Sequence, residues 1–333
     1  MTGEYYLLIA ALTISFLIFL YFIGRVVENT TLKKGLVADE VPAGNSFIGF
    51  SFFVIGFVFL VGTIWSMYEF KGTFLPESAS YEGVKIDDMT WSTFVVTFIV
   101  FILTHIALFV FAFKYRFAKT RKAEFISHNT TLEIIWTAVP SVVLATLIGQ
   151  GIFTWNEIMA PPVKSECVVI EATAKQFGWI FRYAGPDGEL GPRKFGLIDD
   201  NVSNELGIDL TNPNSHDDLY SSKLMLPKDK EVLMILGSRD VLHSFYLPHF
   251  RVKMDCVPGM PTHFNFKPRL TTNEMRAKLG KENFNYELAC AEMCGAGHYG
   301  MMKEVEVVTQ DEFNAWVQKQ YDDKKTYKAL IEQ

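Results

Sequence analysis

One short stretch in the C-terminal third gathers side chains that bind soft metal ions. It reads Cys290-Ala-Glu-Met-Cys294-Gly-Ala-Gly-His298-Tyr-Gly-Met301. Two cysteines four positions apart in a glycine-rich loop can point both sulfur atoms at one place. Thiolate and thioether groups are soft ligands and imidazole is intermediate, and this set suits copper. Zinc prefers a closed tetrahedron of Cys and His and has little use for Met301.

The same loop allows a purely structural interpretation. A disulfide between Cys290 and Cys294 is the main alternative, because this part of the chain is expected on the oxidising side of a membrane. The added His298 and Met301 at fixed spacing favour copper instead. A c-type haem in this chain is excluded by the missing C-x-x-C-H motif.

The composition indicates a membrane part joined to a water-facing part. Of 333 residues, 49% are hydrophobic and 20% are charged, and Phe alone occurs 29 times. Apolar residues crowd the first half and charges the second. The formal net charge of −6 argues against nucleic acid as a partner, since such binders need a basic face.

Four runs without Asp, Glu, Lys or Arg are long enough to cross a bilayer as helices. The loops after the first and third runs are basic, which predicts that they are cytoplasmic and that the N-terminus and everything after the fourth run lie outside. The first run follows Glu4 and precedes Arg25, the wrong charge order for a cleaved signal peptide, so we expect a retained helix. The four runs are Tyr5–Gly24, Phe47–Met67, Met89–Phe113 and Ile134–Asn156.

After the fourth run, apolar segments of strand length separated by Gly and Pro predict an all-β sandwich or barrel. The stretch from Gly185 to Ser222 is acidic and rich in Gly, Pro, Asn and Asp, and it is an insertion that is either a solvated loop or a docking surface. The tail after Gln310 has apolar residues at helical spacing. The predicted strands include Cys167–Ile170, Phe177–Tyr183, Glu231–Leu236, His263–Phe266 and Val305–Val308.

The chain from Trp91 to Val308 resembles the subunit II family of haem–copper oxidases, which carries a binuclear copper centre called CuA. The resemblance is strongest in Asp240-Val-Leu-His243-Ser-Phe, in Asp255-Cys-Val-Pro-Gly259 and in the Cys290–Met301 loop. Together with the strand signals it implies an all-β cupredoxin-like sandwich, which follows a membrane α-helical N-terminal part where the apolar runs predict four transmembrane helices. It also implies two copper ions.

The resemblance implies a role for each donor. Cys290 and Cys294 match the two thiolates that bridge both copper ions. His243 and Met301 match the pair that completes one copper, and the family's spacing selects Met301 over the adjacent Met302.

The other copper is completed, by the same resemblance, by His298 and the backbone carbonyl of Glu292. The Glu292 carboxylate matches a ligand of a Mg²⁺ ion at the interface with subunit I. Two bridging sulfurs let one electron be shared by two metal ions with little change of geometry.

A second segment, Glu133-Ile-Ile-Trp136-Thr-Ala-Val-Pro140, opens the fourth run and resembles the family's E-x-x-W-T-x-x-P segment. There the Glu lies at the cytoplasmic mouth of a proton-uptake path that serves subunit I. The alternative is that Glu133 caps its helix, where the dipole favours an acid. Both interpretations can hold together.

The aromatic stretch from Lys175 to Tyr183 is also similar to the family's. The family often has Trp where Phe177 stands, as the point where electrons arrive from cytochrome c, so the Phe puts a simple transfer of that role in doubt. Trp179 is equally explained as a core residue, as aromatics in strands commonly are.

The expected function is therefore that of subunit II of a respiratory cytochrome c oxidase in a bacterial inner membrane. Electrons from cytochrome c would pass through CuA to haem in subunit I, where O₂ is reduced and protons are pumped. Subunit III and the lipid bilayer are further expected partners. Two rivals are a copper carrier or assembly factor and the CuA domain of a nitrous oxide reductase, but the latter needs a β-propeller for which the chain has no room.

The expected domains are two extra transmembrane helices (1–70), the family's transmembrane hairpin (71–157), the CuA domain (158–309) with an acidic insertion near 185–222, and a helical tail (310–333). The extra helices have no counterpart in the usual family member. They suggest an interface in a supercomplex with a quinol-oxidising complex such as alternative complex III.

Overall fold

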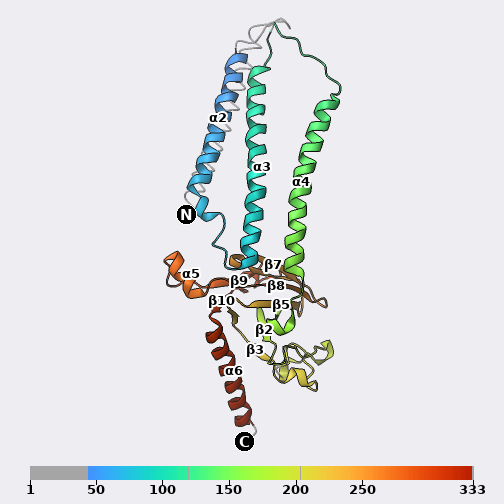
Figure 1. The fold of residues 1–333 in the computed structure, drawn as a ribbon, viewed down its shortest axis with the longest axis vertical. Coiled ribbons are helices and arrows are strands. Elements are labelled where there is room, and N and C mark those ends of the chain that lie inside the picture. Colours follow the sequence, from blue (N-terminus) through green and yellow to red (C-terminus); the bar gives the residue numbers. More distant parts are fainter. Residues whose placement is uncertain (1–43, 119, 203, 332–333) are drawn as a thin grey trace. The chain divides into compact units, whose positions relative to one another are not determined.

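The computed structural model describes residues 44–118, 120–202 and 204–331 (Figure 1). The first predicted span, Tyr5–Gly24, lies outside these residues. The described residues divide into two compact units, one within 44–72 and 94–137, the other within 73–93 and 138–331.

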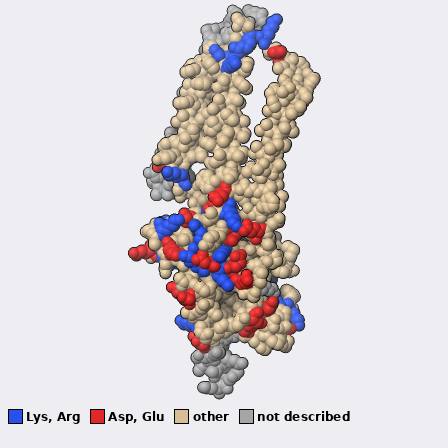
Figure 2. Space-filling model, in the orientation of Figure 1, with Lys and Arg blue, Asp and Glu red and all other residues tan. Residues whose placement is uncertain are grey.

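Three helices in the described part are long and apolar enough to cross a membrane, and they contain the second, third and fourth predicted spans. Figure 2 shows that charged side chains are scarce along these helices and dense over the β domain. The helices extend beyond the predicted spans. Those spans were defined as runs without charged residues, and the end turns of the helices carry charged residues. The three are α2 (Asn45–Glu69), α3 (Tyr81–Lys114) and α4 (Thr130–Met159).

Helix α2 packs against α3 through glycines that leave room for aromatic rings. A Cβ atom on Gly56 would lie 2.3 Å from Cγ of Phe109, so the Phe109 ring of α3 packs directly on the backbone of α2 at this point. His105 of α3 lies inside the third predicted span. Its Nδ1 lies 2.8 Å from the Phe101 carbonyl one turn earlier, and its ring contacts Phe59 of α2. In an apolar setting, the carbonyl of the same helix is the nearest polar partner.

The outer domain has two five-stranded sheets, ordered β3-β2-β1-β5-β8 and β4-β10-β9-β6-β7. Buried side chains from both sheets form one core, which confirms the predicted sandwich. Each predicted strand overlaps an observed one. The strands are β1 (Cys167–Lys175), β2 (Gly178–Tyr183), β3 (Leu219–Ser221), β4 (Leu224–Pro227), β5 (Glu231–Ser238), β6 (His243–Leu247), β7 (Val252–Cys256), β8 (Thr262–Phe266), β9 (Tyr286–Cys290) and β10 (Lys303–Val308).

The acidic insertion, residues 185–222, is tied to the sandwich by ion pairs. Arg182, only 2% exposed, pairs with Glu171 of β1 at 2.8 Å and with Asp218 of the insertion at 3.0 Å. Removing one partner of such a buried pair typically costs about 3–5 kcal/mol, so these contacts fix the insertion strongly. At the surface, Asp200 pairs with Arg239. The insertion is thus an ordered part of the domain.

Two helices complete the domain. Helix α5 (Thr272–Leu279) begins with a capping box between Thr271 and Glu274. Helix α6 (Gln310–Ile331) confirms the predicted helical tail, and its Trp316 packs edge-on against Tyr183 with ring centroids 5.1 Å apart.

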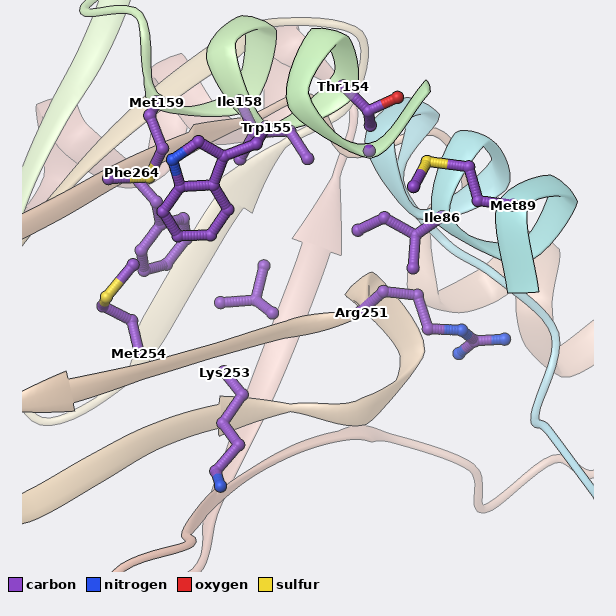
Figure 3. A pocket seen from close by; sticks show the side chains of 12 residues that line it. Ile86, Met89, Thr154, Trp155, Ile158, Met159, Arg251, Lys253, Met254 and Phe264 are labelled. Atoms are coloured by element: carbon purple, nitrogen blue, oxygen red, sulfur yellow. The ribbon is translucent and has the colours of Figure 1, made fainter. Parts of the chain in front are cut away.

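An apolar pocket of about 180 Å³ lies where the outer ends of α3 and α4 reach strands β7 and β8. Figure 3 shows Trp155 of α4 beside Phe264 of β8. Arg251 at its edge is held by Asp87 of α3, with Nε 2.6 Å from Oδ1, which fixes the outer turn of α3 on the domain.

Candidate metal centre

The first two donors are brought together by neighbouring strands. His243 opens β6 and Cys290 closes β9, and these strands pair antiparallel with Phe245 opposite Cys290. The start of one strand therefore lies beside the end of the other. Just beyond, the N–H of Ala291 donates to the Ser244 carbonyl at 3.0 Å and directs the chain into the loop that carries the other donors.

The loop folds back so that its side chains meet the first two. The Sγ atoms of Cys290 and Cys294 lie 4.0 Å apart. Next to Cys290 Sγ are Nδ1 of His243 at 3.8 Å and the Glu292 carbonyl at 3.2 Å. Next to Cys294 Sγ are Nδ1 of His298 at 3.6 Å and Sδ of Met301 at 3.4 Å.

The four other donor groups expected from the sequence therefore lie around the two sulfurs, with one nitrogen and one further donor beside each. The ligand atoms of His243, Cys290 and Cys294 all lie within 4.8 Å of one another. Met301 is 1% exposed whereas Met302 is 43% exposed, which agrees with the choice of Met301 from the spacing. The Glu292 side chain is exposed.

The donor set fits copper. Two thiols, two imidazoles and a thioether are soft or intermediate ligands, and the buried site keeps water away from them. Cys290 and Cys294 are both free thiols. The disulfide alternative for Cys290 and Cys294 is thus not the state of this structure.

Burial favours the protonated thiol at two of the cysteines, Cys294 and Cys256. Burial, and next the charge of Cys290, raise the pKa of Cys294 to about 11. Cys256, which lies opposite His243 in the β6–β7 pair, is fully buried, and this burial raises its pKa to about 12.

A layer of hydrogen bonds holds the donors in place. Asp240 Oδ1 lies 2.9 Å from Nε2 of His243. A carboxylate only accepts, so Nε2 carries the proton and Nδ1, which faces Cys290, is left with its lone pair for a metal. Burial alone would raise the pKa of Asp240, but hydrogen bonds from the Gln176 N–H and from His243 hold it below its ordinary value.

The two aromatic residues singled out in the sequence, Phe177 and Trp179, both contact the donor loop. Trp179 is 4% exposed and its Nε1–H donates to the Met301 carbonyl at 2.8 Å. Phe177 is 45% exposed, and its ring lies so close to the loop that a Cβ on Gly297 would be 2.4 Å from Phe177 Cγ. Sequence reasoning did not assign roles to Asp240 or Gln176, although Asp240 lies three residues before His243.

Glu133 lies in the other unit, in the first turn of α4. Its Oε1 accepts from the Asn129 N–H at 3.2 Å, while Asn129 Oδ1 accepts from the Leu132 N–H at 3.1 Å. The helix-capping interpretation of Glu133 is therefore visible in the structure.

Long apolar helices joined to a β sandwich with a buried thiolate–imidazole–thioether cluster define a membrane metalloprotein of the copper-binding kind. Residues 62–150 match the transmembrane domain model of cytochrome c oxidase subunit II, and residues 168–308 match the model of its periplasmic domain. The chain belongs to the cytochrome c oxidase subunit II family, and it is part of the haem–copper oxidase group of oxidoreductases.

Two relatives agree with this in sequence. The chain is 32% identical over 247 residues to the alternative cytochrome c oxidase subunit 2 of Bradyrhizobium diazoefficiens, covering 74% of this chain and 82% of that one. It is 28% identical over 267 residues to subunit 2 of Thermostichus vulcanus, covering 73% and 77%. A crystal structure of the periplasmic domain of subunit II from Bradyrhizobium japonicum is 27% identical, covers 50% of this chain and 99% of that one, and has a TM-score of 0.33.

Proposed function

We propose that this chain is the electron-accepting subunit of a respiratory cytochrome c oxidase. It takes electrons from cytochrome c at a binuclear CuA centre and passes them to haem in subunit I, where O₂ is reduced and protons are pumped. The observation that carries the proposal is the meeting of four further donors around two free thiols 4.0 Å apart.

Each donor has a proposed position. Cys290 and Cys294 would hold both copper ions, His243 and Met301 would be the further ligands of one, and His298 with the Glu292 carbonyl would be those of the other. Each of these pairs has one member beside Cys290 and one beside Cys294, which supports this division. When bound, the copper pair supplies a one-electron redox couple.

The exposed carboxylate of Glu292 is proposed to hold Mg²⁺ shared with subunit I. Its backbone carbonyl and its side chain would then serve two different metal sites. The carbonyl is 3.2 Å from Cys290 Sγ, which leaves the side chain free to face a partner.

Electrons are proposed to arrive through Phe177. Its ring is half exposed on one side and lies on Gly295 and Gly297, next to the ligands Cys294 and His298, on the other. Trp179 is buried and its Nε1–H donates to the Met301 carbonyl, which favours a supporting role for Trp179.

The proposed setting is a bacterial inner membrane with the N-terminus and the CuA domain on the periplasmic side and subunits I and III as partners. Glu133 is proposed to open a proton path on the cytoplasmic side. Residues 1–70 are proposed as a supercomplex interface with a quinol-oxidising complex such as alternative complex III. Purification in a mild detergent that yields only oxidase subunits would contradict that last assignment.

The test is copper counting with electron paramagnetic resonance on the purified full chain, reduced and then loaded with copper. We expect two copper ions per chain and a mixed-valence signal delocalised over both. A single exchangeable copper would instead favour a copper carrier or assembly factor and would overturn the proposal.

A further inference from the structure

We propose that Gln176 is a positioning residue of the metal centre. It holds His243, here called the first half of the donor set, in register with the loop that carries Cys294, the second half. This inference rests on the proposed function for its meaning in electron transfer. Its structural basis is a pair of hydrogen bonds that run from one residue to both halves.

The backbone of Gln176 connects to the first half. Its N–H donates to Asp240 Oδ2 at 2.7 Å, and the other oxygen of that carboxylate lies 2.9 Å from Nε2 of His243. The orientation of the His243 ring therefore depends on a carboxylate that Gln176 holds from the opposite side.

The side chain of Gln176 connects to the second half. Its amide Nε2–H donates to the Cys294 carbonyl at 2.6 Å. A Cβ atom on Gly295 would lie 3.0 Å from this Nε2, so the amide packs directly on the loop backbone. Gly295 also has φ +135°, a conformation that favours glycine. Gln176 thus fixes the loop at the residue that supplies one of the thiols.

Ion pairs of the insertion support this arrangement from outside. Glu205 pairs with Lys175, the residue before Gln176, and Asp200 pairs with Arg239, the residue before Asp240. The two segments that meet at the Gln176–Asp240 bond are therefore both held by the same insertion. Trp179, whose Nε1–H binds the Met301 carbonyl, supports only the far end of the loop.

The test compares Gln176→Leu, which removes the side-chain N–H donor to the Cys294 carbonyl, with Gln176→Lys, which keeps an N–H donor of similar reach. Gln318→Leu on α6 is the control, because Gln318 is exposed and its amide bonds only within its helix, to Asp322. The first readout needs no copper: the rate at which 5,5′-dithiobis(2-nitrobenzoate) reacts with the loop thiols of the reduced, metal-free chain. We expect Gln176→Leu to raise it about fivefold, the factor for one net hydrogen bond.

The second readout is copper retention against a chelator, with the hyperfine pattern of the loaded chain. Loss of an outer hydrogen-bond partner typically weakens metal affinity about 10–100-fold. We expect that loss and a less symmetric signal in Gln176→Leu, and recovery in Gln176→Lys. Equal behaviour of Gln176→Leu and the wild type, or of Leu and Lys, would overturn the proposal. If the wild type failed to bind two copper ions, the proposed function would fail while the thiol readout still decided the role of Gln176.

Discussion

At the scale of single residues, the donors differ in how easily each could be replaced. The two thiols lie at the centre of the donor set, and the Met301 thioether lies beside one of them, 3.4 Å from Cys294 Sγ. A weak thioether ligand tunes the metal more than it retains it. Loss of the Met301 sulfur should therefore change the properties of the bound metal, whereas loss of a cysteine should weaken its binding.

Met301→Leu keeps the volume of the side chain and removes its sulfur. We expect copper to stay bound through the thiolates, while the reduction potential shifts and electron transfer slows. The measurement is redox titration of the loaded chain together with turnover of the assembled oxidase. Met302→Leu, one residue away and exposed, is the matched control; unchanged turnover and potential in Met301→Leu would refute the ligand assignment.

The raised thiol pKa predicts how copper uptake depends on pH. Copper binds the thiolate, and a pKa of about 11 for Cys294 leaves that thiol almost wholly protonated near neutral pH. Uptake should quicken with pH between about pH 6 and pH 9, approaching tenfold per unit, and should release protons. Stopped-flow loading with a pH indicator measures both. A rate independent of pH would mean that deprotonation of the thiols does not limit uptake.

The raised pKa also has a consequence for the metal-free fold, with a definite sign. A thiol whose pKa is higher in the folded chain favours folding at low pH, and that contribution is lost as the pH rises from about 9 toward about 11. The metal-free chain should therefore melt at a lower temperature at the alkaline end of this range.

At the scale of elements, the donor loop depends on close contact with the β1–β2 turn. Gly297 lies under the Phe177 ring, whereas Gly300, three residues on in the same loop, has nothing within 4 Å of a Cβ placed there. One glycine is thus required by packing and the other is not.

Gly297→Ala should therefore displace either Phe177 or the loop, because the added carbon would lie 2.4 Å from the ring. Overpacking of this kind typically costs about 1–3 kcal/mol. We expect a lower melting temperature and a distorted copper signal in Gly297→Ala, and wild-type behaviour in Gly300→Ala. Differential scanning calorimetry and paramagnetic resonance on both variants check this; equal stability of the two would show that the loop yields freely.

At the scale of the whole molecule, the proposed path for protons is separate from the path for electrons. Glu133 belongs to one compact unit and the donor cluster to the other. A change at Glu133 should therefore affect the coupled reaction of the assembled oxidase without affecting copper.

Glu133→Gln is the informative substitution, because its side-chain oxygen can still accept from the Asn129 N–H but carries no exchangeable acid proton. We expect proton-coupled reduction of the catalytic site to slow by at least about tenfold, with an intact copper spectrum. Flash-induced reduction kinetics of the assembled oxidase measure this. Glu133→Ala, which also removes the cap, is the comparison; slowing in Ala alone would make Glu133 a capping residue only.

The sequence by itself already indicated the candidate donor set. The spacing of Cys290, Cys294, His298 and Met301 is local, so a short loop must keep these side chains near one another whatever surrounds it. The apolar spans were equally readable, because a bilayer demands about 20 apolar residues in a row. Their outer ends were not, since α3 continues to Tyr81 through charged turns that are stabilised by Arg251 and other residues of the β domain.

Only the tertiary structure decided what surrounds the donors. His243 reaches Cys290 because β6 and β9 are neighbours, and Gln176 reaches both Asp240 and Cys294 because a turn between β1 and β2 lies against the loop after β9. Such contacts join residues 64 and 118 positions apart. Local sequence cannot specify them, because they depend on which strands pair, and strand pairing is set by the burial of the whole core.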